Sequence, residues 1–297
     1  MTGTQVLFVD KLTTNKKKSL SNIIMKKVFF AICLLFLNFT FSQIRINGIV
    51  KSEANIPLQY VNIGIKNKNV GTISDEKGNF SITIDNNRIN EFLTFSYISF
   101  EEKTVNIEEL IKFKFQEIIL KEKATVLEEV LIISTKATEL KIGTKSYSSM
   151  VAGYVRANND KNNDIQEFAK KIKLKKPSVL LDVNLNLFNV KTDTASFRIN
   201  IYNIKNDLPN EKINTENIIV KKKVENGWNK FDLQNFNLKY NVPVFITIEY
   251  LPKKMDEKEP FRYGGQLFGE SITRSSSLGI WNSKSGLTMA MYVTVKQ

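Results

Sequence analysis

The chain has 297 residues, of which 42% are hydrophobic and 25% are charged, and this composition is typical of a globular protein with room for two domains. Histidine is absent and Cys33 is the only cysteine. These absences exclude a Ser-His-Asp triad, a Cys-His pair, a zinc knuckle and an internal disulfide. We therefore expect a protein that is not an enzyme, with no catalytic residues, no cofactor and no metal site.

The formal net charge of +13 is unevenly distributed. Residues 44–133 carry 11 basic and 13 acidic side chains, whereas residues 134–297 carry 26 basic and 16 acidic ones. Lysine runs at 170–176 and 221–223 indicate either a solvated face or contact with an acidic surface such as a glycan. No nucleic-acid-binding motif accompanies them, so we do not expect nucleic acid as a partner.

The N-terminal region has the pattern of a signal peptide. Two lysines after Met25 precede an apolar run over residues 28–41, which is shorter than the roughly 20 residues of a membrane span. Thr40 and Ser42 are the small residues expected before a cleavage site, so Gln43 is predicted to begin the mature chain. The protein is then exported to the periplasm, the outer-membrane surface or the medium. The alternative is an uncleaved segment that anchors it in the inner membrane, which would be its only membrane contact.

Past the signal peptide, the sequence predicts an all-β protein built from two sandwiches. It divides into an N-terminal extension and signal peptide (1–42), a small β-sandwich (43–133), a polar linker (134–145) and a jelly-roll-like β-sandwich (146–297). In the first sandwich, β-branched and aromatic residues alternate with polar ones, as in short antiparallel strands. The predicted strands are Ile44–Val50, Tyr60–Ile65, Phe80–Ile84, Phe92–Tyr97 and Thr104–Ile107.

The turn Ser74–Phe80 has two interpretations. In the structural one, the Asp75 side chain caps a tight turn and Gly78 adopts a positive φ. In the functional one, Asp75, Glu76 and Asn79 bind Ca²⁺. The spacing lacks the other oxygen ligands of an EF-hand loop, which favours the structural interpretation.

The spacing of these residues resembles the carboxypeptidase-like regulatory domain. The motifs that carry the resemblance are Ile46-x-Gly48-x-Val50, Pro57-Leu58-x-x-Val61, Gly71-Thr72-x-Ser74-Asp75-x-x-Gly78-x-Phe80 and Leu93-x-Phe95-Ser96-Tyr97. The resemblance implies a transthyretin-like accessory sandwich, common in exported proteins of Gram-negative bacteria and often found before TonB-dependent outer-membrane receptors. Leu127–Ile132 is similar to the segment that leads into the plug of such receptors.

The second sandwich is predicted to be rich in strands, with Asn, Asp, Gly and Pro in the turns. For Asp164–Lys176 a helix is the alternative, because several apolar residues there fit one helical face. The predicted strands are Tyr147–Arg156, Phe168–Leu174, Val179–Val190, Ser196–Ile204, Asn217–Val224, Trp228–Leu233, Val244–Leu251, Ser271–Trp281 and Leu287–Val295.

The candidate ligand-binding residues lie in two predicted loop regions of the second sandwich. Phe261, Arg262 and Tyr263 precede a Gly-Gly pair, and Trp281 precedes a polar, glycine-containing stretch. Aromatic faces stack on sugars or peptides and an arginine pairs with carboxylates, so these four residues are predicted to bind a ligand. The alternative is that the aromatic side chains belong to the core.

Three functions remain open from the sequence. The leading hypothesis is an exported, non-catalytic binding or scaffolding module of the envelope or cell surface, with a glycan or envelope protein as partner. The second is an accessory partner of a TonB-dependent outer-membrane receptor. The third is a glycan hydrolase with two carboxylates in one cleft; its candidates are Asp182, Asp193, Asp232 and Glu249.

Overall fold

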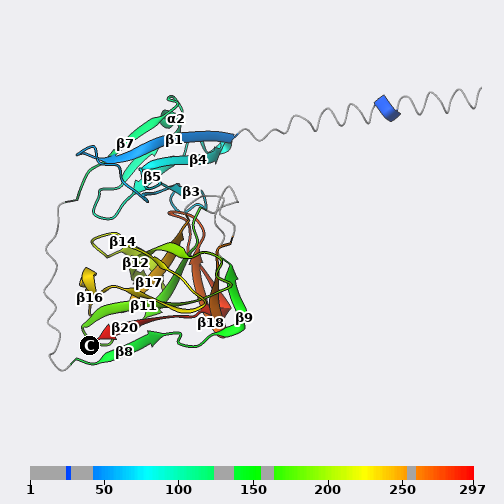
Figure 1. The fold of residues 1–297 in the computed structure, drawn as a ribbon. Coiled ribbons are helices and arrows are strands. Elements are labelled where there is room, and N and C mark those ends of the chain that lie inside the picture. The colour runs from blue at the N-terminus through cyan, green and yellow to red at the C-terminus, as the bar shows by residue number, and fades with distance from the viewer. Residues whose placement is uncertain (1–24, 28–42, 124–136, 155–163, 253–258) are drawn as a thin grey trace, which may run out of the picture. The chain divides into compact units, whose positions relative to one another are not determined.

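The computed structural model describes residues 25–27, 43–123, 137–154, 164–252 and 259–297 (Figure 1). The described residues from Ile44 to Gln297 belong to one compact unit. Among the described residues, no helix is long and apolar enough to cross a membrane. The predicted signal peptide core and the segment Leu127–Ile132 lie outside the described residues.

Over residues 43–123, the first sandwich has seven strands in two sheets. They are β1 (Gln43–Ser52), β2 (Asn62–Gly64), β3 (Gly71–Ile73), β4 (Asn79–Asp85), β5 (Phe92–Ser96), β6 (Lys103–Asn106) and β7 (Gln116–Leu120), with the short helices η1 (Asn86–Arg88) and α2 (Ile107–Leu110). One sheet has the order β4-β1-β7, in which β1 and β7 are parallel, and the other has the order β3-β2-β5-β6.

The core of the first sandwich follows from the alternation in the sequence. Every second residue of β1 is buried from Ile46 to Ser52, and β7 alternates in the same way. Both sheets contribute to one hydrophobic cluster, in which the rings of Phe80 and Phe95 meet edge to face at 5.5 Å. The predicted all-β sandwich is therefore confirmed for this part of the chain.

The turn between β3 and β4 is held by the side chain of Asp75. One of its carboxylate oxygens, Oδ1, accepts hydrogen bonds from the backbone N–H groups of Lys77 and Asn79, both at 2.8 Å. Gly78 has a φ of 78°, and a Cβ there would lie 2.7 Å from the carbonyl oxygen of Val50. These contacts account for the Asp-x-x-Gly spacing as a structural turn.

In the described part of the second sandwich, thirteen strands are joined in one continuous hydrogen-bonded network. They are β8 (Glu139–Gly143), β9 (Ser148–Tyr154), β10 (Glu167–Ile172), β11 (Ser178–Phe188), β12 (Thr194–Lys205), β13 (Leu208–Lys212), β14 (Ile218–Lys223), β15 (Gly227–Asp232), β16 (Lys239–Tyr240), β17 (Val244–Leu251), β18 (Arg262–Arg274), β19 (Asn282–Met289) and β20 (Met291–Lys296), with the 3-10 turn η2 (Gln234–Phe236).

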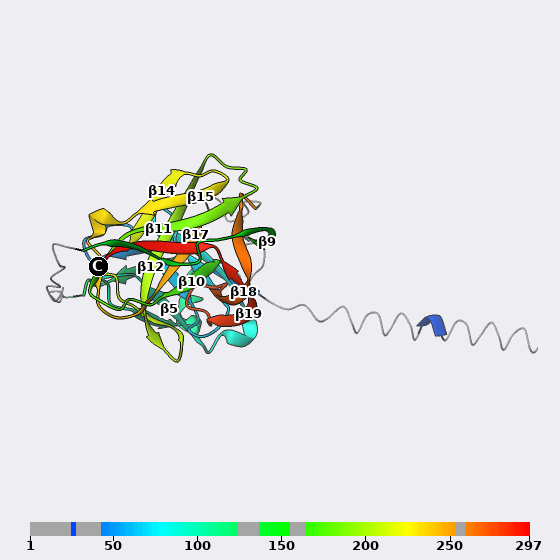
Figure 2. The same ribbon diagram turned by 90° about the horizontal axis from the view of Figure 1, so that it is seen from below.

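Strand β18 links the two layers of this sandwich. Its C-terminal residues Ile272–Arg274 pair with β10, and its first residues, Arg262 and Tyr263, pair with β11. The main path runs β13-β12-β17-β10-β18-β11-β20-β8, and Figure 2 shows the red β20 alongside the green β11. Strands from both layers contribute to the main hydrophobic cluster, which lies between them.

The structure differs from the sequence-based prediction in several strands, and β3, β7, β13 and β16 are absent from that prediction. Strand β8 lies within the predicted linker and pairs with β20, because a polar edge strand needs only one partner. The strand predicted at Ser271–Trp281 instead ends at Arg274, and β18 begins at Arg262 in the segment predicted to be a loop. In the segment Asp164–Lys176, in contrast, the predicted strand is present as β10 and the helical alternative is not.

The contacts of Gly78 predict the effect of a glycine substitution. Gly78→Ala should lower the free energy of unfolding by more than Gly227→Ala, because both glycines have a positive φ but only the Cβ at 78 meets backbone within 4 Å. Chemical denaturation of the two variants measures the difference. Equal losses would contradict the steric role of this turn.

Candidate functional site

The sheet that contains β12 has an apolar face and a polar face. Alternate residues of β12, including Phe197 and Ile199, enter the main hydrophobic cluster. The intervening side chains, Arg198, Asn200 and Tyr202, point to the opposite face and are also buried. Burial on both faces requires the polar side chains to find partners there.

On this polar face, four charged side chains form a row across four adjacent strands. Arg198 of β12 is directly opposite Glu249 of β17, Glu249 is opposite Glu167 of β10, and Glu167 is opposite Arg274 of β18. The order is therefore plus, minus, minus, plus. Two carboxylates placed opposite each other repel, and each is neutralised by the arginine on its other side.

Arg198 also joins the first sandwich to the second within the compact unit. Its Nε and Nη2 donate to the two carboxylate oxygens of Glu249 at 2.9 and 2.8 Å. Nη2 also donates to Oδ1 of Asn62 at 2.6 Å, and Nη1 donates to the carbonyl oxygen of Tyr60. Tyr60 has a φ of 58°, which is rare for a bulky residue.

Glu167 is the centre of the polar face. Its Oε1 accepts hydrogen bonds from Asn200 at 2.9 Å, from Tyr202 at 3.1 Å and from the hydroxyl of Thr247. Its Oε2 accepts from Nε of Arg274 at 3.0 Å. Burial alone would raise the pKa of Glu167, but the charges of Arg274 and Lys212 and these hydrogen bonds lower it to about 2.

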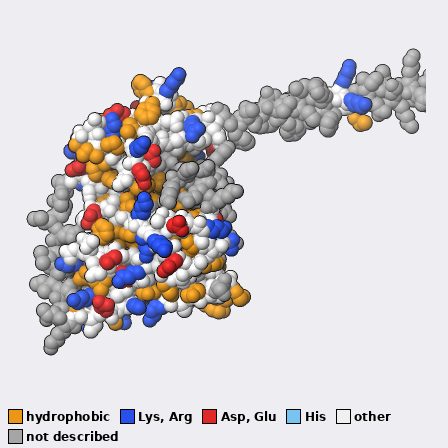
Figure 3. All heavy atoms as spheres, viewed as in Figure 1, with side chains coloured by type: hydrophobic (Ala, Val, Ile, Leu, Met, Phe, Trp, Pro, Cys, Tyr) orange, Lys and Arg blue, Asp and Glu red, His pale blue; other side chains and the backbone are white. Residues whose placement is uncertain are grey.

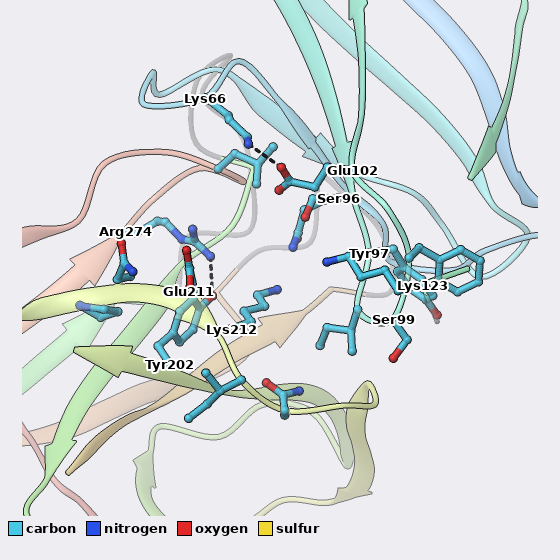
Figure 4. Close-up of a pocket in the computed structure, with 18 of the residues that line it drawn as sticks. Lys66, Ser96, Tyr97, Ser99, Glu102, Lys123, Tyr202, Glu211, Lys212 and Arg274 are labelled. Carbon is cyan, nitrogen blue, oxygen red and sulfur yellow. Dashed lines mark hydrogen bonds and ion pairs between the residues drawn. The ribbon is translucent and has the colours of Figure 1, made fainter. Parts of the chain in front are cut away.

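Beside this network lies a cleft of about 1060 Å³ with residues of both sandwiches in its walls. The first sandwich contributes loop residues that include Lys66 and Glu102, which form an ion pair with each other. The second contributes Tyr202, Arg274 and strand β13. Figure 4 shows these two groups of side chains on opposite sides of the cleft.

The floor of the cleft combines aromatic and cationic groups. The guanidinium of Arg274 lies 4.7 Å from the ring centroid of Trp281, and Tyr202 meets Trp281 edge to face at 5.7 Å. Lys212 is opposite Tyr202 in the pairing of β13 with β12 and is half-buried. Its side chain projects into the space between the two walls in Figure 4.

The loop that carries Trp281 is fixed by a buried carboxyl group. The backbone N–H of Ser277 donates to Oδ1 of Asp164 at 2.9 Å. Asp164 is 3% exposed, and burial raises its pKa to about 6. Asp164 is therefore ionised at neutral pH in a site that disfavours the charge.

The four predicted ligand-binding residues do not form one site. Phe261 and Tyr263 are 0% and 1% exposed and belong to the main hydrophobic cluster, so the prediction that they bind ligand is wrong. Aromatic residues at the start of a strand pack inward where a loop was expected. Arg262 is half-buried and pairs with Glu259 at 3.4 Å. Trp281 is half-buried and lines the cleft.

The lysine runs serve structural roles at several positions. Nζ of Lys170 donates to the hydroxyls of Thr144 and Thr288, and burial lowers its pKa. Lys222 donates to a backbone carbonyl and lies 5.1 Å above the ring of Phe231. Basic and acidic side chains are interspersed on the face shown in Figure 3. In the part of the chain that the structure describes, no group of three or more Asp, Glu, His or Cys residues is placed to hold a metal ion.

The described geometry defines an all-β protein with two sandwiches and a cleft lined by cations and aromatic groups. Residues 46–132 match the family model of the CarboxypepD_reg-like domain, so the chain carries a carboxypeptidase-regulatory-like domain in its first sandwich. The resemblance predicted from the sequence is thereby confirmed for this part of the chain.

Two further proteins are similar to parts of the chain. The TonB-dependent receptor P39 of Formosa agariphila is 30% identical over 131 residues, which is 43% of this chain and 12% of the receptor. The chain thus spans about an eighth of that relative's length. A structure of the cysteine protease and lectin-like domains of Cwp84, a surface layer associated protein of Clostridium difficile, aligns with a TM-score of 0.34 and 11% identity, covering 45% of this chain and 32% of that one.

The pKa of Asp164 predicts a pH-dependent stability. Because the folded-state pKa of about 6 lies above that of an unfolded aspartate, the folded state binds more protons between about pH 4 and 6. The stability of the wild type relative to Asp164→Asn should therefore rise as the pH falls from 7 to 4. Urea denaturation at both pH values measures it, and a constant difference would contradict the burial of an ionised group.

Proposed function

We propose that this chain is an exported, non-catalytic binding module of the cell envelope and that the cleft is its ligand site. The observation that carries the proposal is the cleft floor, where the half-buried Trp281 is held by Arg274 and Tyr202. An aromatic ring fixed in this way offers a preorganised surface for stacking and loses little entropy on binding. Polar groups around the ring fix the orientation of a bound ligand.

A binding role is favoured over hydrolysis by the arrangement of the carboxylates. Glu249 is fully buried and bound by Arg198, and Asp182 is nearly buried and pairs with Lys230 at 3.1 Å. Asp232 is opposite Asp182 on β15, and Asp193 is exposed before β12. The candidates for a glycosidase pair thus lie outside the set of residues that line the cleft.

The first sandwich supports the proposed location in the cell envelope. Its CarboxypepD_reg-like domain and the similarity to part of a TonB-dependent receptor fit an envelope protein, in the periplasm, at the outer-membrane surface or secreted. The same similarity favours a second function, as an accessory partner of such a receptor. Co-purification of the tagged chain with a TonB-dependent receptor from detergent-solubilised outer membranes would support this function, and its absence from that fraction would count against it.

A pair of tryptophan variants tests the cleft as the ligand site. Trp281→Ala should abolish sedimentation of the protein with isolated cell-envelope fractions, because the stacking surface is lost. Trp228→Ala is the matched control: Trp228 is also half-buried and packs against Tyr147 and Tyr292, but it does not line the cleft.

The same assay separates binding from catalysis. The wild type should release no soluble sugar or peptide from the envelope fractions that it binds. Equal binding by the two tryptophan variants would reject the cleft as the site, and steady release of fragments by the wild type would reject a non-catalytic role.

A further inference from the structure

The charges at the cleft floor leave one cation without a matching carboxylate. Arg198 is paired with Glu249, and Arg274 is paired with Glu167. Lys212 is the third cation of the cluster, and among the described residues no carboxylate lies within ion-pair distance of its ammonium group. A half-buried ammonium group without a counter-ion is a favourable position for a ligand anion.

The surroundings of Lys212 make its charge sensitive to a ligand. Burial and the positive charges of Arg198 and Arg274 lower the pKa of Lys212 to about 7, against the opposing effect of Glu167 and Glu249. Among the other charged residues that line the cleft, Lys66 pairs with Glu102, Glu101 pairs with Lys121, and Glu211 accepts a hydrogen bond from Asn203. Lys123 is exposed on the wall that the first sandwich forms, away from the floor where Lys212 lies beside Arg198 and Arg274. An anion that entered beside Lys212 would therefore favour its protonated form.

The other residues that line the cleft indicate which class of molecule bears the anionic group. Exposed neutral polar side chains line the cleft, and Trp281 lines it as well, with the guanidinium of Arg274 4.7 Å from its ring centroid; these polar residues are Asn67, Ser99, Asn210 and Thr215. Amides and hydroxyls suit the hydroxyl groups of a sugar, and an aromatic ring suits the apolar face of a sugar ring. An ammonium group beside them suits a sugar carboxylate.

We propose that the cleft binds an acidic oligosaccharide, with a sugar carboxylate held by Lys212 beside Arg274 and a sugar ring stacked on Trp281. This inference rests on the proposed binding function and specifies its ligand class. Because Lys212 is partly neutral at and above pH 7, binding of the carboxylate is accompanied by uptake of a proton. The affinity of the cleft for the acidic sugar thus decreases as the pH rises above 7.

Titration calorimetry with tetragalacturonate and its full methyl ester tests the proposal, because the two sugars share one backbone and the ester has no charged carboxylate. The wild type should bind the acid at least tenfold more tightly than the ester at pH 6.5, and its affinity for the acid should fall at least tenfold between pH 6.5 and 9. At pH 8, heats measured in buffers of different ionisation enthalpy should show the uptake of about one proton per ligand.

Two variants of Lys212 test whether the preference for the acid and its pH dependence come from this side chain. Lys212→Met should reduce the affinity for the acid to that for the ester. Lys212→Arg should restore preference for the acid and remove the pH dependence, because arginine stays protonated throughout this range. Lys205→Met is the matched control for net charge, since Lys205 is exposed on β12 and does not line the cleft. It should bind like the wild type.

Several outcomes would overturn the inference while leaving the proposed function in place. Equal affinity of the wild type for acid and ester, or unchanged binding by Lys212→Met, would show that Lys212 does not recognise a carboxylate. Binding of tetraglutamate in preference to tetragalacturonate would reject a sugar as the ligand. If neither sugar binds at millimolar concentration while envelope binding still depends on Trp281, the cleft binds a ligand of another class.

Discussion

The structure depends on a row of four buried charges across the sheet of the second sandwich. Glu249 and Glu167 are opposite each other on neighbouring strands, where two carboxylates in a medium of low dielectric repel strongly. The sheet is stable because Arg198 and Arg274 flank them in the same row. Each arginine must stay in register with its glutamate, since removing one partner from a buried pair leaves an uncompensated charge.

This row has consequences beyond the sheet. Arg198 extends to the backbone of Tyr60 and the side chain of Asn62, so the same charge that neutralises Glu249 fixes the first sandwich to the second. Arg274, at the other end, supports Trp281 at the cleft floor. The network thus positions both walls of the cleft, and Lys212 is the cation that it leaves available for a ligand.

The sequence was sufficient to predict most of the strands, but of the residues that line the cleft it singled out only Trp281 for ligand binding. Alternation of apolar and polar residues predicts most strands, because one buried face imposes a period of two. It cannot predict the row of charges: Arg198 and Glu249 are 51 residues apart, and their meeting depends on cross-strand register. Lys212 is a single lysine at the end of a short strand, and nothing in its local sequence distinguishes it. Phe261 and Tyr263 were misassigned because Gly264 and Gly265 indicated a loop, whereas both glycines lie within β18.

The glycines in β18 show why glycine alone does not predict a loop where two strands pack closely. A Cβ at Gly264 would lie 2.2 Å from the side-chain oxygen of Asn186, so the glycine allows close approach of two strands and not a turn. Trp281, in contrast, was predicted to contact a ligand and does line the cleft. Its neighbours there come from distant parts of the chain, which only the fold brings together.

The most direct test of this account is a double-mutant cycle at Arg198 and Glu249, measured by chemical denaturation at pH 7. Each single change, Arg198→Met or Glu249→Met, should cost about 3–5 kcal/mol, because it leaves one buried charge unpaired. The double variant should recover at least half of the summed loss. Single losses below about 1 kcal/mol that simply add in the double variant would show that the row of charges does not hold the structure together.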